Sequence, residues 1–346
     1  MTVTAFAPVI ESRAFDESKH VNYTLGMLLG VDDFHQEFAY LAGRTRRLAR
    51  DASGYGTVFG LAVSIDTKDD AKGPRIVVES GAAITPKGQL VCVRPSQCAY
   101  LDEWLAAKRK ELEKEGVTIP SNIDANVVLA YRDCPSDPVL LPGEACRDDK
   151  ELSVDSRISD SFTLELRREA PVQNEENAVR AFIAWLQKIP FGGVGPFLDA
   201  TAFEKLIRDS VKEPEAEDDS EPRNTGWIPI TFTDPPADAR LDAATAREMF
   251  GIVMRVWTTH IRTLVHPLCT GGCGCCGPKH HDFVEPDDLL LLAKVTMPVK
   301  AADNGDWVID RDQLATLKLD ESNRPLLLHT RMVQELSAMA LAMATK

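Results

Sequence analysis

Four short apolar segments follow one another between residues 57 and 93, and they restrict the possible folds more than any other feature. The segments are residues 57–65, 75–79, 82–85 and 89–93. Turn-forming residues separate the later ones, namely Gly81 and the Pro86-Lys87-Gly88 triplet. Links this short cannot hold the crossover that joins parallel strands. We therefore predict antiparallel hairpins in this region.

A helix is expected before these strands, from Asp32 or Asp33, which can cap it, to about Arg50. Ser53 and Gly54 then end it. Its apolar residues recur at three-, four- and seven-residue steps, at Phe34, Phe38, Leu41 and Leu48. That spacing places them on one face of a helix, and we predict that this face is a buried stripe.

The rest of the chain alternates between helical and extended patterns. Helices are expected at 100–115, 175–187, before 211, at 242–265 and at the C-terminus, and strands at 126–131, 161–167, 227–232, 288–297 and 307–309. A Pro-rich loop is expected at 134–146. In the helix at 175–187 the inward residues would be Val179, Phe182, Ile183 and Leu186. The C-terminal helix carries Met332, Leu336, Met339 and Met343, which suit either a core or a protein contact.

These elements predict an α+β protein with an antiparallel, β-rich N-terminal domain, a helical insertion and a C-terminal helix-and-strand segment. The predicted divisions are an extended arm at 1–19, the β-rich domain with its N-terminal helix at 20–170, the helical insertion at 171–211, a linker at 212–226 and the C-terminal segment at 227–346. The linker is acidic and flanked by prolines, a composition that cannot bury apolar surface.

The charge balance sets aside two classes of partner. The chain has 53 acidic and 39 basic residues, a net charge of −14, which disfavours nucleic acid and anionic membrane as main partners. The dense basic run of Arg44, Arg46, Arg47 and Arg50 is interpreted as a solvated or protein-contacting helix face. No segment reaches the roughly 20 apolar residues of a membrane helix, and the N-terminus lacks a secretory pattern. We expect a cytoplasmic protein, or one in a virion-like particle assembled in the cytoplasm, without direct membrane insertion.

A cysteine-rich loop offers the one candidate metal site. It holds six thiol and imidazole groups within thirteen residues: Cys269, Cys273, Cys275, Cys276, His280 and His281. Such groups could form a tetrahedral zinc shell. However, structural zinc sites usually join two separated knuckles, and adjacent cysteines do not easily bind one ion. A surface loop between subunits and disulfide pairing in an oxidising medium are the alternatives, so zinc stays a candidate cofactor.

Catalytic motifs are missing from the sequence. The Gly-rich segment 192–195 follows a helical pattern and lacks the Lys-Ser/Thr pair of a phosphate-binding loop. Neither a Gly-x-Ser-x-Gly elbow nor a His-Glu-x-x-His motif occurs. We therefore predict a non-enzymatic protein. An unrecognised hydrolase remains an alternative, which a deep pocket lined by acids with shifted pKa values would favour.

Several segments resemble a known family. They are Gly-Met-Leu-Leu-Gly-Val-Asp-Asp-Phe at 26–34, Gly-Thr-Val-Phe-Gly-Leu-Ala-Val at 56–63, Val-Val-Glu-Ser-Gly-Ala-Ala-Ile-Thr-Pro-Lys-Gly-Gln at 77–89, and stretches of 128–167 with Pro-Gly-Glu-Ala-Cys at 142–146. These resemble uncharacterised proteins encoded beside phage-tail-like contractile injection systems, as does the cysteine-rich loop followed by Leu-Leu-Leu-Ala-Lys-Val. The resemblance covers most of residues 20–168 and a patch near 266–297.

This resemblance implies a structural or baseplate-associated component of a contractile particle, at its baseplate or surface shell. Its partners would be other subunits, such as baseplate, sheath or shell proteins. The resemblance supplies no catalytic residues. The alternative function is a metal-binding module or assembly factor built on the loop 269–281.

Overall fold

The structure is a computed structural model, and it divides the chain into two compact units. Unit 1 comprises Met1–Ala170 and Asp288–Lys346, and unit 2 comprises Pro171–Asp287. The structure describes residues 15–68, 72–114, 119–140, 153–194, 196–212, 230–265, 288–302 and 305–344. The five predicted divisions of the chain stay predictions.

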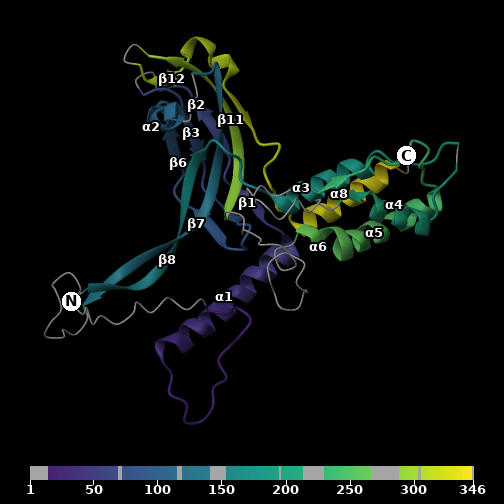
Figure 1. Ribbon diagram of the computed structural model, residues 1–346, viewed down its shortest axis with the longest axis horizontal. Helices are drawn as coiled ribbons and strands as arrows, with labels where there is room; N and C mark the ends of the chain where they lie inside the picture. The colour runs from purple at the N-terminus through teal and green to yellow at the C-terminus, as the bar shows by residue number, and fades with distance from the viewer. Residues whose placement is uncertain are drawn as a thin grey trace, which may run out of the picture. The chain divides into compact units, whose positions relative to one another are not determined.

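Unit 1 contains two small antiparallel sheets built from the N-terminal strands (Figure 1). One has the order β1-β4-β5 and the other β2-β3-β6. The strands are β1 (Gly56–Gly60), β2 (Val63–Asp66), β3 (Arg75–Val78), β4 (Gly81–Ile84), β5 (Leu90–Val93) and β6 (Gln97–Tyr100). The predicted antiparallel hairpins are confirmed.

The predicted single strand at 57–65 is wrong, because the chain changes sheets within it. Gly60 pairs with Gly81 at the crossing, and the next residue, Leu61, is fully buried with a φ of 55°. A Cβ on Gly81 would lie 2.4 Å from the Phe59 carbonyl oxygen, so only glycine allows the two backbones to approach this closely. The glycine pair therefore creates a corner where a periodic pattern suggested one straight strand.

A larger antiparallel sheet completes unit 1, with the order β12-β11-β7-β8 and with β13 also paired to β11. Its strands are β7 (Asn122–Leu140), β8 (Ser153–Arg167), β11 (Leu289–Ala301), β12 (Trp307–Ile309) and β13 (Lys318–Asp320). Residues 134–140, predicted as part of a Pro-rich loop, instead continue β7, where Pro135 and Pro138 face partners in β8.

The core of unit 1 lies among these sheets and the helix α2 (Leu101–Lys114). Leu101 and Leu105 of α2 are fully buried, as are Leu290, Leu292 and Met297 of β11. The buried strand predicted at 288–297 is thus confirmed by β11. The other helices of unit 1 are α1 (Val31–Ser53), the 3-10 helix η2 (Arg311–Thr316) and α8 (Thr330–Ala344).

Unit 2 is mainly helical and has its own core. Its elements are α3 (Asn174–Leu186), α4 (Ala200–Ser210), α5 (Ala243–Val256), the π-helix η1 (Trp257–Ile261), α6 (Arg262–Val265) and the short antiparallel pair β9 (Val211–Lys212) and β10 (Thr231–Phe232). Asp199 and Asp242 cap α4 and α5, each accepting a backbone N–H three residues on at 2.7 Å. Phe182, Trp185, Phe203 and Ile207 form the centre of this core.

With helices inserted among antiparallel strands, the chain is an α+β protein, as predicted.

Candidate interaction surface

The C-terminal end of α1 is fixed tightly to the strands of unit 1. The turn between β4 and β5 lies against it so closely that a Cβ on Gly88, whose φ is 83°, would be 2.1 Å from the Arg46 carbonyl oxygen. Just beyond the helix, Thr57 exchanges two backbone hydrogen bonds of 2.9 Å with Pro325 and Leu327. These contacts hold α1 by its last turns.

One face of α1 is covered by the chain that precedes it. The Gln36 amide donates to the Asp16 carbonyl at 2.6 Å, and the Glu37 carboxylate accepts the Val21 N–H at 3.0 Å. Gly43, the one fully buried residue of α1, faces the side chain of Glu17. The residues before the helix therefore pack along the face that carries positions 36, 40, 43 and 47.

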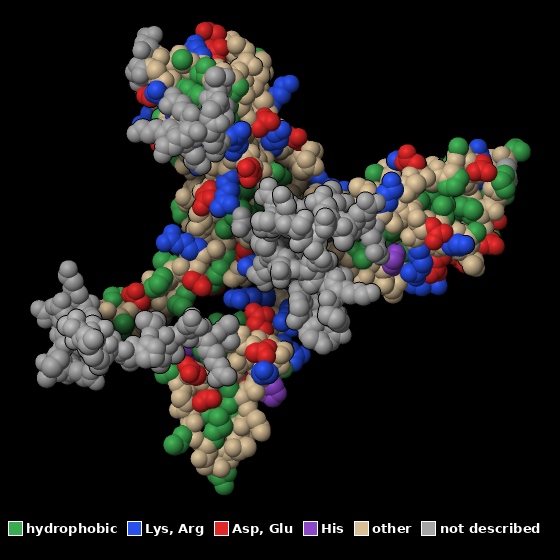
Figure 2. All heavy atoms as spheres, in the orientation of Figure 1, with side chains coloured by type: hydrophobic (Ala, Val, Ile, Leu, Met, Phe, Trp, Pro, Cys, Tyr) green, Lys and Arg blue, Asp and Glu red, His purple; other side chains and the backbone are tan. Residues whose placement is uncertain are grey.

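The opposite face of α1 is apolar and exposed. Its large side chains have exposed fractions of 59% for Phe34, 69% for Phe38, 56% for Leu41 and 71% for Leu48. Val31 continues the face at 69%. Figure 2 shows hydrophobic side chains gathered on the surface of the part formed by α1 and the residues before it. We call Val31, Phe34, Phe38, Leu41 and Leu48 the α1 stripe.

The prediction that this stripe is buried is wrong. The spacing of the apolar residues correctly indicated one helix face, but the chain before the helix packs on the other face. A periodic pattern predicts which residues share a helix face, but it does not predict which segment or chain covers that face. A contiguous exposed apolar face of this kind is typical of a protein–protein contact.

Strands β7 and β8 form a second exposed feature, a ladder that continues as far as Leu140 opposite Ser153. Near its base, the Tyr131 hydroxyl lies 2.7 Å from carboxylate oxygens of both Asp133 and Asp160. Burial, followed by these hydrogen bonds to Asp160 and Asp133, raises the pKa of Tyr131 above its usual range. Toward the tip, Val139 and Ile158 are exposed. This ladder offers backbone edges and apolar side chains to a neighbour.

The C-terminal helix α8 adds further exposed apolar residues. Met332 and Met339 are each 56% exposed. Of the two predicted roles, a core helix does not fit these two methionines, whereas a flexible apolar contact surface does.

The six predicted metal-ligand residues, Cys269, Cys273, Cys275, Cys276, His280 and His281, lie outside the described residues. Among the residues that are described, no group of three or more His, Cys, Asp or Glu side chains could hold a metal ion. The zinc site therefore stays a prediction. Cys92, Cys98 and Cys134 are free thiols at exposed positions rather than the small buried residues that scattered cysteines usually are.

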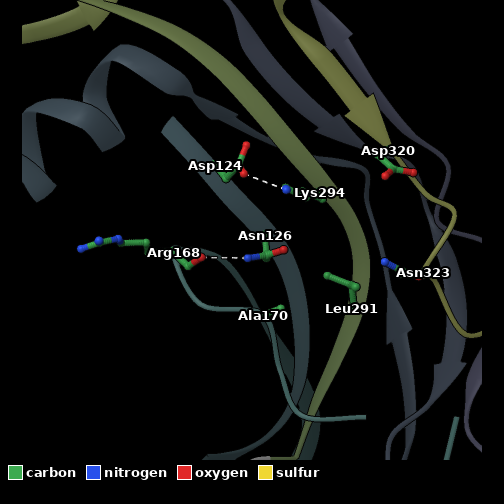
Figure 3. A pocket seen from close by; sticks show the side chains of 8 residues that line it. All are labelled: Asp124, Asn126, Arg168, Ala170, Leu291, Lys294, Asp320 and Asn323. Carbon is green, nitrogen blue, oxygen red and sulfur yellow. Dashed lines mark hydrogen bonds and ion pairs between the residues drawn. The ribbon is translucent and has the colours of Figure 1, made fainter. Parts of the chain in front are cut away.

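A shallow polar recess of about 350 Å³ lies beside β7 and β11 (Figure 3). Asp124 forms a 2.7 Å ion pair with Lys294 on the neighbouring strand, and the Thr296 hydroxyl donates to it at 2.7 Å. These hydrogen bonds, first from Lys294 and then from Thr296, hold the pKa of Asp124 below its usual value. Asn126 donates to the Arg168 carbonyl at 3.0 Å. Such paired groups join strands, and they do not form a poised acid–base pair.

Asp288 is expected to show a measurable pH effect. Its carboxylate accepts the Lys87 N–H at 2.8 Å. Desolvation by burial nevertheless raises the pKa of Asp288. This effect is larger than the lowering by the hydrogen bonds from Lys87 and Thr85 and by the charges of Lys87 and Arg46. A raised carboxyl pKa means that the folded state loses stability as the pH rises from the unfolded toward the folded pKa. Asp288→Asn keeps an acceptor for Lys87 and removes the charge. Urea unfolding should show the variant more stable than the natural chain at pH 7, with the difference lost at pH 3; equal stability at pH 7 would contradict this.

Comparisons with known proteins are sparse. No protein-family model and no curated protein matches the chain. Among solved structures, the chain is similar to one titled "Crystal structure of TssK", with 13% sequence identity and a TM-score of 0.22, over 77% of this chain. It spans 58% of that structure's length. A TM-score this low does not establish a shared fold.

Within the described part of the chain, none of the helices has the length and apolar character that crossing a membrane requires.

Proposed function

We propose that this protein is a non-enzymatic structural component of a phage-tail-like contractile injection particle, at its baseplate or surface shell. The observation that carries the proposal is the α1 stripe, five large apolar side chains exposed along a helix that is fixed at its C-terminal end. Exposure of such an apolar face to water is unfavourable, and assembly with another chain removes the face from water.

The β7–β8 ladder supports the same role. Its outer part, from Asp133 opposite Asp160 to Leu140 opposite Ser153, carries exposed Val139, Val154 and Ile158. A two-stranded ribbon is marginal alone and gains from a neighbour. The resemblance of most of residues 20–168 to proteins encoded beside contractile injection systems indicates which kind of assembly would supply that neighbour.

The test is mass spectrometry of particles purified from the native source by sedimentation. The chain should be found in fixed proportion to the sheath and tube proteins across the gradient fractions that contain particles. In a matched strain without the sheath gene, the chain should be lost from the part of the gradient where intact particles sediment. Recovery of the chain only at the top of the gradient, with intact particles below, would contradict the proposal.

A further inference from the structure

We propose that the α1 stripe binds the same stripe of a second copy of this chain, so that two α1 helices form an antiparallel coiled coil. The inference concerns this surface alone and does not depend on membership of an injection particle.

The spacing of the stripe is that of a coiled-coil seam. Positions 31, 34, 38, 41, 45, 48 and 52 alternate steps of three and four residues over three heptads, and every one of them is exposed. They are occupied by Val31, Phe34, Phe38, Leu41, Thr45, Leu48 and Ala52. A repeat of 3.5 residues is what two supercoiled helices require of their shared seam. A helix packed on a sheet needs no such strict repeat. The occupant that this spacing selects is therefore another helix.

The charges of α1 make it complementary to itself in one direction. The first half carries Asp32, Asp33 and Glu37, and the second half carries four arginines and Asp51, which forms a 2.8 Å ion pair with Arg50. In an antiparallel pair centred on Leu41, Phe34 lies opposite Leu48 of the second copy. In the same register Glu37 lies at the level of Thr45 of the second copy, one residue from Arg44, and positions 37 and 44 share one flank of the seam. A parallel pair would instead set acid beside acid and arginine beside arginine, which is unfavourable.

In the single chain, the side chains of Glu37 and Arg44 can still reach a second copy. Arg44 is exposed, and its guanidinium donates to the Tyr40 hydroxyl at 2.8 Å. Glu37 uses Oε2 to accept the Val21 N–H. The other flank of the seam carries Ala42 and Ala49, whose small side chains allow two helix backbones to approach closely.

Pairing would remove a continuous apolar helix face from water on both chains. Removing apolar side chains from water favours association in proportion to the area buried, and each of the five stripe residues is more than half exposed. A two-fold pair doubles the number to ten side chains. A 23-residue helix is about 34 Å long, so the seam has room for all of them.

The test is sedimentation equilibrium of the full-length chain under reducing conditions. The natural chain should form a dimer, and Leu41→Glu should weaken the dimer by at least about 100-fold in Kd because Leu41 would meet its own copy. The matched control Leu328→Glu, at a residue 62% exposed outside the stripe, should leave the Kd unchanged. Circular dichroism should show both variants folded.

A charge exchange tests the direction of the pair. Glu37→Arg and Arg44→Glu should each weaken the dimer at least 10-fold, and the two together should restore it, because both 37–44 contacts reform with reversed sign. A natural chain that stays monomeric, a dimer indifferent to Leu41→Glu, or failure of the double variant to restore the affinity would overturn the proposal. A chain that dimerises only after removal of residues 1–13 would also overturn it, since that segment would then be the occupant of the stripe.

Discussion

Replacing Trp185 with alanine should lower the free energy of unfolding of unit 2 by about 3–5 kcal/mol. Trp185 is 2% exposed and lies in a group of aromatic rings, with its centroid 6.5 Å from that of Phe182 and 6.1 Å from that of Phe232. Its indole N–H also donates to the Thr233 carbonyl at 2.7 Å. The variant therefore loses apolar burial, ring contacts and a partly buried hydrogen bond together.

Trp185→Phe separates these contributions. It keeps a ring in the aromatic group and loses the hydrogen bond and part of the volume, so we expect a clearly smaller loss than for alanine. Denaturant unfolding followed by circular dichroism measures both. Equal losses for the two variants would show that the aromatic packing contributes little, contrary to the structure.

Leu292→Ala should destabilise unit 1 by about 2–5 kcal/mol. Leu292 is fully buried on β11, the strand that pairs with β7, β12 and β13, so the cavity would form at the centre of the largest sheet. Leu292 packs in the dense core of unit 1, which can relax only partly around such a cavity.

The matched control is Leu328→Ala, the same change at a residue that is 62% exposed. It should change the free energy of unfolding by no more than about 0.5 kcal/mol. The same unfolding measurement applies to both variants. A Leu292→Ala variant as stable as the control would refute the placement of β11 in the core.

Much of the fold was predictable because local periodicity follows local burial. The helix at 175–187 corresponds to α3, and its predicted inward residues Phe182 and Leu186 are buried. Ile183, also predicted inward, is 45% exposed, and Trp185 takes the buried position beside it. The choice between these two neighbours depends on the partners from β10 and η1, which lie far away in the sequence.

Other features depend on contacts that periodicity cannot report. The chain turns a corner at Gly60 because Gly60 and Gly81 lie opposite each other in the paired strands β1 and β4. Which residues lie opposite each other depends on the strand register, and periodicity within one strand does not give it. The extension of β7 past Pro135 depends on its pairing with β8. Prolines suggest a loop when seen alone, but they are tolerated where their ring nitrogen is not needed as a donor.

The exposure of the α1 stripe likewise depends on contacts with distant parts of the chain. The sequence predicts that Phe34, Phe38, Leu41 and Leu48 share one helix face, but it does not predict their exposure, since Gly43 and the preceding chain decide which face is covered. A signal was present in the sequence: the strict alternation of three and four residues from position 31 to position 52. That pattern favours a helix partner over a core position.

The central claim is that the α1 stripe is covered by protein in the cell, and photo-crosslinking from Phe38 addresses it directly. A photoreactive amino acid at Phe38 would be compared with one at Ala106, an exposed position on α2. In the native source, Phe38 should give a discrete crosslinked species containing a second protein chain, which mass spectrometry would identify, while Ala106 gives none. If Phe38 crosslinks no more than Ala106, the stripe is exposed in the cell and the claim is wrong.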